Sequence, residues 1–421
     1  MTTSSIASTI SVTASEKRRN ALLLVYAVSL GLLSVFNSPY ISLFSLFALS
    51  ACVLFDKQLA LSLYICSAIV GADFSSIETL VSAIVVLAIG VSVFDLRDKR
   101  TKRLLMSVTL FSMSMLAGFA LGANSQMITI LILTFKLFMM VTIAQSATIS
   151  NGSILEKAIL YGGLVIAGIT AYHFYVGDIS VLSEGQGRLT YRENVKELST
   201  AIVIPVYMSI NKMLDYRNRR NNRELLFFIL VFALCFPLLL MTYSRGVFIG
   251  LLVSAVLLQL AYSKSLSVQK IVIYTLIVAA VVNIVSSMQL DESLIFENIE
   301  GGNGRTDIWA NYLAYMSNQG IHTLVWGLGS NSYTSLLEFY DHSVILSYYF
   351  HFGIFGILFI TYVVLSALTR LYRSKKPYYL FLVVLTVLMF FTHGSYDNTL
   401  FYIVSGMCLG AANSPQKTYR K

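Results

Sequence analysis

Residues 342–369, HSVILSYYFHFGIFGILFITYVVLSALT, decide the fold class of this chain. The run contains no acidic or basic residue apart from two histidines, and Asp341 and Arg370 bound it on either side. A helix needs roughly 20 mostly apolar residues to cross the hydrocarbon core of a bilayer. The run therefore predicts a membrane-spanning helix.

The rest of the chain has the same character. Of its 421 residues, 56% are hydrophobic and 12% are charged, and the mean hydropathy is +0.73. A soluble domain has roughly 45–50% apolar and about 25% charged residues, so the composition excludes most soluble folds. We expect an all-α, polytopic membrane protein with about 14 transmembrane helices (12–14, because several are short). The expected spans are 21–36, 40–55, 58–72, 79–94, 104–122, 126–148, 158–176, 197–213, 225–243, 246–262, 270–288, 342–369, 377–393 and 399–413.

The net charge of +9 suggests an acidic partner, but its distribution indicates a topology. With a cytoplasmic N-terminus and alternating helices, 24 of the 30 basic and 7 of the 21 acidic residues fall on inner segments, a net +17. The outer segments hold five basic and fourteen acidic residues, a net −9, and Lys136 lies within a helix. Basic residues collect in cytoplasmic loops. We therefore expect both termini in the cytoplasm and no nucleic-acid partner.

This topology divides the chain into seven parts. They are a cytoplasmic tail (1–20), N-terminal transmembrane helices (21–176), a periplasmic loop (177–197), central transmembrane helices (198–288), a large periplasmic loop with an interfacial helix (289–341), C-terminal transmembrane helices (342–413) and a cytoplasmic tail (414–421).

The large loop contains a candidate helix at 306–317. Ile308, Trp309, Tyr312, Leu313 and Met316 recur in it at helical spacing. Such a stripe is typical of an amphipathic helix lying on the membrane. Packing of the same stripe against the transmembrane bundle is an equally good interpretation.

Arginines on the cation-poor outer face are the first candidates for chemistry. Arg245 follows Ser244 at a tight turn, Arg305 follows a Gly-Gly-Asn-Gly run, and Arg188 and Arg192 follow Gly-Gln-Gly. Glycine lets backbone N–H groups approach a ligand, and guanidinium binds phosphate through two hydrogen bonds. The arrangement suggests a site for a phosphate-bearing lipid at the outer interface. Snorkelling or a salt bridge, such as Arg192 with a neighbouring glutamate, is the alternative.

His342 is the candidate base. It stands beside Asp341 at an outer helix start, where it could accept a proton from an attacking hydroxyl. His351 lies deeper in the same run, and we expect it to be buried and hydrogen-bonded. Lys136, within a predicted span, either has a function or neutralises a carboxylate.

No metal site is expected. The five histidines form no HExxH pattern and no pair at ligand spacing with a carboxylate. All four cysteines, at positions 52, 66, 235 and 408, fall inside apolar stretches, so they predict no loop disulfide and no zinc site.

Three separated motifs resemble the O-antigen ligase/polymerase superfamily of bacterial membrane glycosyltransferases. They are Ser244-Arg245-Gly246, then Asn303-Gly304-Arg305 with Trp309 and the later segment 326–333 (WGLGSNSY), and then His342-Ser343-Val344-Ile345-Leu346 with Gly353 and Gly356. The resemblance covers about residues 185–370. Members of the family often have Asn where Ser343 stands, a departure that bears on subtype more than on reaction class.

The resemblance implies a metal-independent inverting enzyme of the C-type glycosyltransferase architecture, with no cofactor, in the bacterial inner (cytoplasmic) membrane. Its donor is a glycan on undecaprenyl pyrophosphate at the periplasmic face. Arg245 and Arg305, with Arg188, would hold the pyrophosphate, Arg192 would contact the substrate, and His342 would align or deprotonate the acceptor hydroxyl. Ser244, Trp309, Tyr333, Asp341 and Ser343 complete the expected substrate site. Tyr333 either stacks on sugar rings or anchors the interface.

Three functions remain open. The first is a polymerase that joins lipid-linked repeat units into O-antigen, capsule or exopolysaccharide, with a chain-length regulator as a partner that this role allows. The second is a ligase that transfers the polymer to lipid A core. The third is a lipid-linked oligosaccharide flippase, for which charges lining a midplane cavity, inverted repeats and broken helices are expected.

Overall fold

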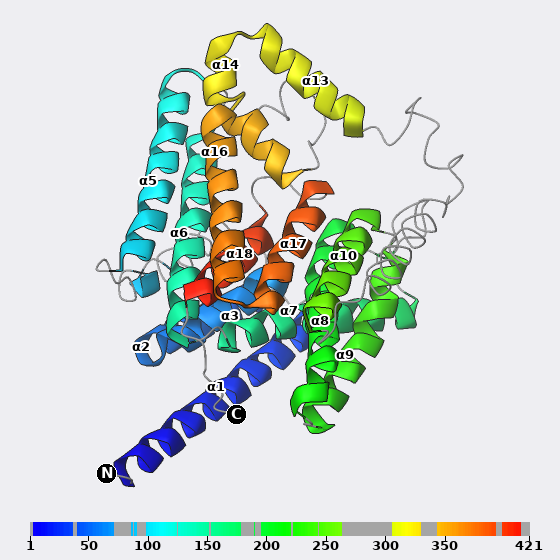
Figure 1. Cartoon of the computed structure of the whole chain (residues 1–421). Coiled ribbons are helices and arrows are strands. Elements are labelled where there is room, and N and C mark those ends of the chain that lie inside the picture. Colours follow the sequence, from blue (N-terminus) through cyan, green and yellow to red (C-terminus); the bar gives the residue numbers. More distant parts are fainter. Residues whose placement is uncertain are drawn as a thin grey trace.

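The computed structural model describes residues 3–36, 40–70, 86, 88–90, 98–123, 125–150, 153–177, 189, 195–219, 222–242, 244–262, 305–329, 343–392 and 398–413. These residues are almost entirely helical, and they contain no β-strand (Figure 1). The helices are α1 (Thr3–Val35), α2 (Ile41–Phe55), α3 (Lys57–Val70), α5 (Lys99–Ala120), α6 (Met127–Ser150), α7 (Ser153–Val176), α8 (Val195–Arg219), α9 (Asn222–Met241), α10 (Arg245–Tyr262), α13 (Arg305–Asn318), α14 (Ile321–Trp326), α16 (Val344–Arg373), α17 (Pro377–Thr392) and α18 (Thr399–Asn413).

The predicted all-α class is confirmed over these residues. Each expected span that falls on them corresponds to a helix, whereas 270–288 and most of 79–94 lie outside the described part of the chain. Six of the described helices, α1, α5, α6, α7, α9 and α16, are long and apolar enough to cross a membrane. Five further apolar helices are shorter. This is the architecture of a polytopic membrane protein.

The apolar surface of the bundle agrees with this architecture. Val25 on α1, Met113 on α5 and Leu230 on α9 are each more than 60% exposed. Side chains of this size are costly to hydrate, and an aliphatic bilayer core removes that cost. The exposed faces of these helices are therefore the faces expected to contact lipid.

The helix α1 begins earlier than the sequence suggested. The polar segment assigned to a tail is helical from Thr3 onward and continues without interruption into the first span. The polar part of α1 extends beyond the rest of the bundle near the N-terminus (Figure 1). Its residues are therefore part of the first helix rather than a separate irregular segment.

The helix α16 is broken, although the apolar run predicted one continuous span. Gly353 has a φ of +60° and a ψ of −147°, which are not helical angles. Residues 344–352 form a first half that folds back against the second, and a Cβ on Gly356 would lie 1.9 Å from the carbonyl oxygen of Tyr348. The broken helix and α14 lie at the end of the bundle where α13 crosses (Figure 1).

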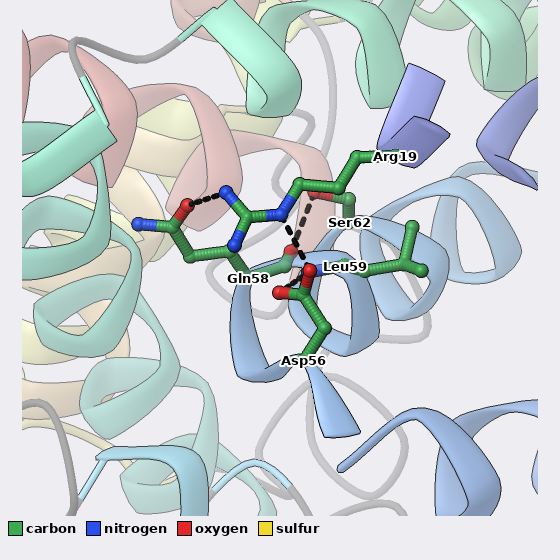
Figure 2. A network of polar contacts seen from close by, with 5 residues as sticks. All are labelled: Arg19, Asp56, Gln58, Leu59 and Ser62. Carbon is green, nitrogen blue, oxygen red and sulfur yellow. Dashed lines mark hydrogen bonds and ion pairs between the residues drawn. The ribbon is translucent and has the colours of Figure 1, made fainter. Parts of the chain in front are cut away.

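Polar contacts join helices at the opposite end of the bundle. The guanidinium of Arg19 on α1 forms an ion pair with Asp56 and donates to Oε1 of Gln58 at 3.0 Å (Figure 2). Asp56 precedes α3, and its Oδ1 accepts a hydrogen bond from the N–H of Leu59 at 3.2 Å. The network therefore ties the start of α3 to α1.

Other helices meet at the same end. Lys212 on α8 forms an ion pair with Glu224 on α9 at 2.6 Å, and Lys376 donates to the carbonyl oxygen of Ala411 at 2.6 Å. Glu156 near the start of α7 accepts a hydrogen bond from Tyr379 near the start of α17. Most of these residues belong to segments that the charge pattern assigns to the inner face. The contacts bring those segments together, as an alternating topology requires.

Asp98 caps α5 at this end. Its carboxylate accepts hydrogen bonds from the N–H groups of Arg100 (3.2 Å) and Thr101 (3.1 Å), which satisfies free donors of the first turn. Burial raises the pKa of Asp98, but hydrogen bonds from Thr101 and from these N–H groups outweigh burial, and the pKa lies below its usual value. The cap therefore stays ionised at neutral pH.

Candidate functional site

The first motif lies where α10 begins. Arg245 is the first residue of α10, and Ser244 immediately before it is 4% exposed. The carbonyl oxygen of Ser244 accepts the N–H of Phe248 at 3.1 Å, so Ser244 closes the first turn of the helix. Ser244 is thus buried at a helix start, and the first N–H groups and the dipole of a helix favour negative charge there.

The loop that carries Arg188 reaches this turn. The N–H of Leu189 donates to the carbonyl oxygen of Met241, the last residue of α9, at 3.0 Å. Leu189 is fully buried. The chain next to Arg188 therefore lies beside the turn that connects α9 to Ser244 and Arg245, as a shared site requires.

The second motif lies at the start of α13. This helix begins at Arg305, and the ring of Trp309 packs against Phe391 near the end of α17, with 5.8 Å between centroids. Tyr312 and Met316 are almost fully buried against Leu328 and Phe350, whereas Leu313 is 48% exposed. The predicted helix is confirmed, and Trp309, Tyr312 and Met316 of its stripe pack on the bundle, which agrees with the second of the two interpretations above.

The third motif lies at the start of α16. Ser343 is the N-cap, it is completely buried, and its hydroxyl oxygen accepts the N–H of Leu346 at 3.3 Å. Ser343 thus caps the helix, and asparagine, which often stands here in the family, is an equally good N-cap residue. Because of the break at Gly353, this start belongs to a short half-helix instead of a full span.

The end of α17 lies close to two of the three helix starts and to the start of α18. Leu385 and Leu388, in the second half of α17, lie close to Gly250, which comes five residues after the start of α10. Phe390 of α17 packs against Phe401 of α18, at 5.6 Å between ring centroids. The starts of α10 and α13 therefore lie near the same end of α17.

A buried tyrosine pair joins α16 to this group, and the sequence did not indicate it. The hydroxyl oxygens of Tyr348 on α16 and Tyr402 on α18 are 2.6 Å apart, and both side chains are completely buried. Tyr348 lies one turn beyond Ser343, so the pair holds the first half of α16 against α18. Neither the hydrophobic periodicity nor the composition of the sequence predicts this pair, because tyrosine is common throughout the chain.

The segment from Trp326 to Gly329 is part of the helix break. The N–H groups of Leu328 and Gly329 donate to the carbonyl oxygens of Phe350 (2.8 Å) and His351 (3.1 Å), where the first half of α16 ends. The ring Nδ1 of the fully buried His351 lies 2.8 Å from the carbonyl oxygen of Gly329. The predicted burial and hydrogen bonding of His351 are confirmed.

Several predicted site residues cannot be placed in this geometry. Five of them, Arg188, Arg192, Tyr333, Asp341 and His342, lie outside the described residues, and the side chains of Arg245 and Arg305 are also outside them. Lys136 lies half-buried in the middle of α6. Within the described ranges, no group of three or more His, Cys, Asp or Glu side chains comes together to hold a metal ion.

The chain was also compared with known proteins. No protein-family model matches it, and a search of curated proteins finds no match. The resemblance to the ligase/polymerase superfamily therefore depends on the three motifs and on where their helices begin.

Proposed function

We propose that this protein is a bacterial inner-membrane glycosyltransferase that joins undecaprenyl-pyrophosphate-linked oligosaccharide units at the periplasmic face. The observation that carries the proposal is the placement of the three motifs. Arg245 and Arg305 each begin a helix and Ser343 caps a third, at the end of the bundle opposite the basic contacts. Helix starts and guanidinium groups both favour a pyrophosphate.

In the proposed reaction, an acceptor hydroxyl attacks the anomeric carbon of the donor sugar. The bond from that carbon to the pyrophosphate oxygen breaks, and the leaving group departs with the bonding electrons. Arg245 and Arg305 stabilise the negative charge that develops on it, which is the largest expected contribution. His342 takes the hydroxyl proton. Configuration at the anomeric carbon inverts.

Reconstitution with lipid-linked repeat units tests this proposal. We expect His342→Ala, Arg245→Ala and Arg305→Ala each to slow chain growth by roughly a hundredfold or more, the cost typical of removing one transition-state donor. Lys102→Ala, which removes an exposed cation at the other end of the bundle, is the control and should leave the rate unchanged. Wild-type rates in all three site variants would reject the mechanism.

The product separates the two transferase roles. Polymer bound to undecaprenyl pyrophosphate indicates a polymerase, and polymer on lipid A core indicates a ligase. The same donor and the same three residues serve both reactions. A requirement for a chain-length regulator can be examined in the same assay by adding the regulator to the polymerase reaction.

The break in α16 favours a second candidate, a lipid-linked oligosaccharide flippase. Transporters build their sites from discontinuous helices whose half-helix starts point at anionic groups, and residues 344–352 form such a half-helix. Arg245 and Arg305 begin their helices at the same end of the bundle, which suits chemistry at one surface better. Movement of labelled lipid-linked oligosaccharide across a vesicle membrane without chain growth would favour the flippase.

A further inference from the structure

A pocket lies at the end of the bundle away from the proposed transfer site, where α5 begins and where α6, α16 and α18 end. Arg100 of α5 and Arg370 of α16 both line it, together with Gln145, Thr148 and Asn413. It is a shallow recess whose empty space of about 250 Å³ includes its open mouth. Its enclosed part has room for about one water molecule, so a larger group such as a phosphodiester would lie at the mouth.

Polar contacts hold the walls of this pocket in place. Nη1 of Arg100 donates to Oδ1 of Asn413 at 3.1 Å, which ties the start of α5 to the end of α18. The hydroxyl of Thr101 donates to Oδ2 of Asp98 at 2.8 Å and lies 2.6 Å from Oε1 of Gln145. Thr101 and Gln145 are both more than 90% buried. The pocket is therefore a polar recess among apolar helices.

The charges around the recess are mostly positive. Arg100 and Arg370 come from different helices, and Lys99, Lys102 and Arg373 lie on the same two helix ends. Asp98 is the acidic residue beside Arg100, and its carboxylate is already engaged with Thr101 and the first turn of α5. Two arginines that line one recess suit a singly charged phosphodiester at its mouth.

The surfaces next to the recess are apolar and exposed. Met106, Leu110 and Met113 on α5 are 56–61% exposed, and Leu358 and Leu365 on α16 are 59% and 56% exposed. The helices α5 and α16 contact each other through Phe111 and Phe359, whose stacked rings are 4.5 Å apart. A molecule with a phosphate head and aliphatic chains could place its chains on these surfaces while its head lies at the mouth of the recess.

We propose that this recess binds the phosphodiester headgroup of an anionic phospholipid of the surrounding membrane. Basic recesses between transmembrane helices near the cytoplasmic surface suit such headgroups, because the guanidinium groups neutralise the phosphate while the acyl chains stay in hydrocarbon. A bound lipid links α5, α6, α16 and α18 at the end that the charge pattern assigns to the cytoplasm. The proposal does not depend on the transfer reaction.

Binding of short-chain phosphatidylglycerol to the purified full-length protein in neutral detergent tests the proposal, with thermal stability and native mass spectrometry as measurements. We expect phosphatidylglycerol to raise the melting temperature and phosphatidylcholine to have little effect. In Arg100→Gln/Arg370→Gln the affinity should fall roughly tenfold or more. Arg100→Lys/Arg370→Lys keeps both charges and should retain most of the binding, which controls for folding.

The matched control is Lys102→Gln/Arg373→Gln, which removes two exposed charges from the same helix ends outside the recess. It should bind phosphatidylglycerol almost as the wild type does. Equal losses in the two glutamine variants would mean general attraction to a basic surface and would overturn the proposal. Equal stabilisation by inorganic phosphate at the same concentration would assign the recess to a soluble anion and would also overturn it.

Discussion

At Gly327 the backbone has a φ of +81°, and a Cβ would lie 2.3 Å from the carbonyl carbon and oxygen of His351. Gly320, at the other end of α14, has a φ of +89° with nothing within 4 Å of its Cβ position. At both positions ψ is −178°, a combination with positive φ that essentially only glycine adopts, so any other residue would be strained by about 1–3 kcal/mol. Gly327 carries in addition the contact with α16.

We therefore expect Gly327→Ala to destabilise the protein by at least about 2 kcal/mol more than Gly320→Ala, because the backbone of the helix break has to move. Titration with a denaturing detergent measures both changes. Equal losses would mean that backbone strain alone matters at Gly327 and that the close approach to His351 does not.

At the level of single residues, the sequence drew attention to Gly327, Gly329 and His351, and the predicted burial of His351 is confirmed. The glycines stood out as parts of a motif, and His351 as a residue deep in an apolar run. Their mutual contact could not be predicted, because it joins two segments more than 20 residues apart through backbone atoms. The periodicity of apolar residues predicts on which face of a helix a side chain lies, and it contains no information about a contact between backbone atoms of distant segments.

The first half of α16 depends on the Tyr348 and Tyr402 pair for its attachment to α18. Removing one hydroxyl leaves the other buried without this hydrogen-bond partner, which costs about 1–3 kcal/mol. Removing both hydroxyls leaves no hydroxyl that lacks its partner at this contact. We expect Tyr348→Phe and Tyr402→Phe each to lower the unfolding free energy, and the double variant to lose less than the sum of the two losses.

A double-mutant cycle by detergent titration checks this expectation. Tyr349→Phe, on the same half-helix but only half-buried, is the matched control and should change stability little. Additive losses in the cycle would mean that the two hydroxyls do not depend on each other.

At the level of elements, helix positions followed from apolar length, and the expected interfacial helix at 306–317 corresponds to α13. The break in α16 did not follow. Its sequence stays apolar through Gly353, so a period argument predicts a continuous helix. The φ of +60° is stabilised by contacts from the segment before Gly329, and that segment belongs to another part of the chain.

The whole molecule has two ends of different character. Polar contacts among Arg19, Asp56, Lys212, Glu224 and Lys376 mark one end, and the starts of α10, α13 and α16 mark the other. The positive-inside rule assigns the first end to the cytoplasm. This assignment can be tested in intact cells.

We expect a cysteine at Asn318, at the exposed end of α13, to react with a membrane-impermeant maleimide in cells whose outer membrane is permeabilised. A cysteine at exposed Lys375, between α16 and α17, should react only after the inner membrane is opened. Of the native cysteines, Cys66, Cys235 and Cys408 are buried, and Cys52→Ser removes the half-buried one. The reverse pattern of labelling would invert the topology and place the proposed site in the cytoplasm.

By itself, the sequence determined that this is an all-helical membrane protein, and it predicts that the positive charge collects on one side of the membrane. The length of an apolar run and the positions of charges are local properties, because each segment prefers the hydrocarbon core or the water according to its own residues. Only the tertiary structure decided that α16 is broken, that α13 packs on the bundle, and that Arg100 and Arg370 line one recess. These features depend on contacts between distant segments, whose energies arise from side chains and backbone groups that meet only once the helices pack.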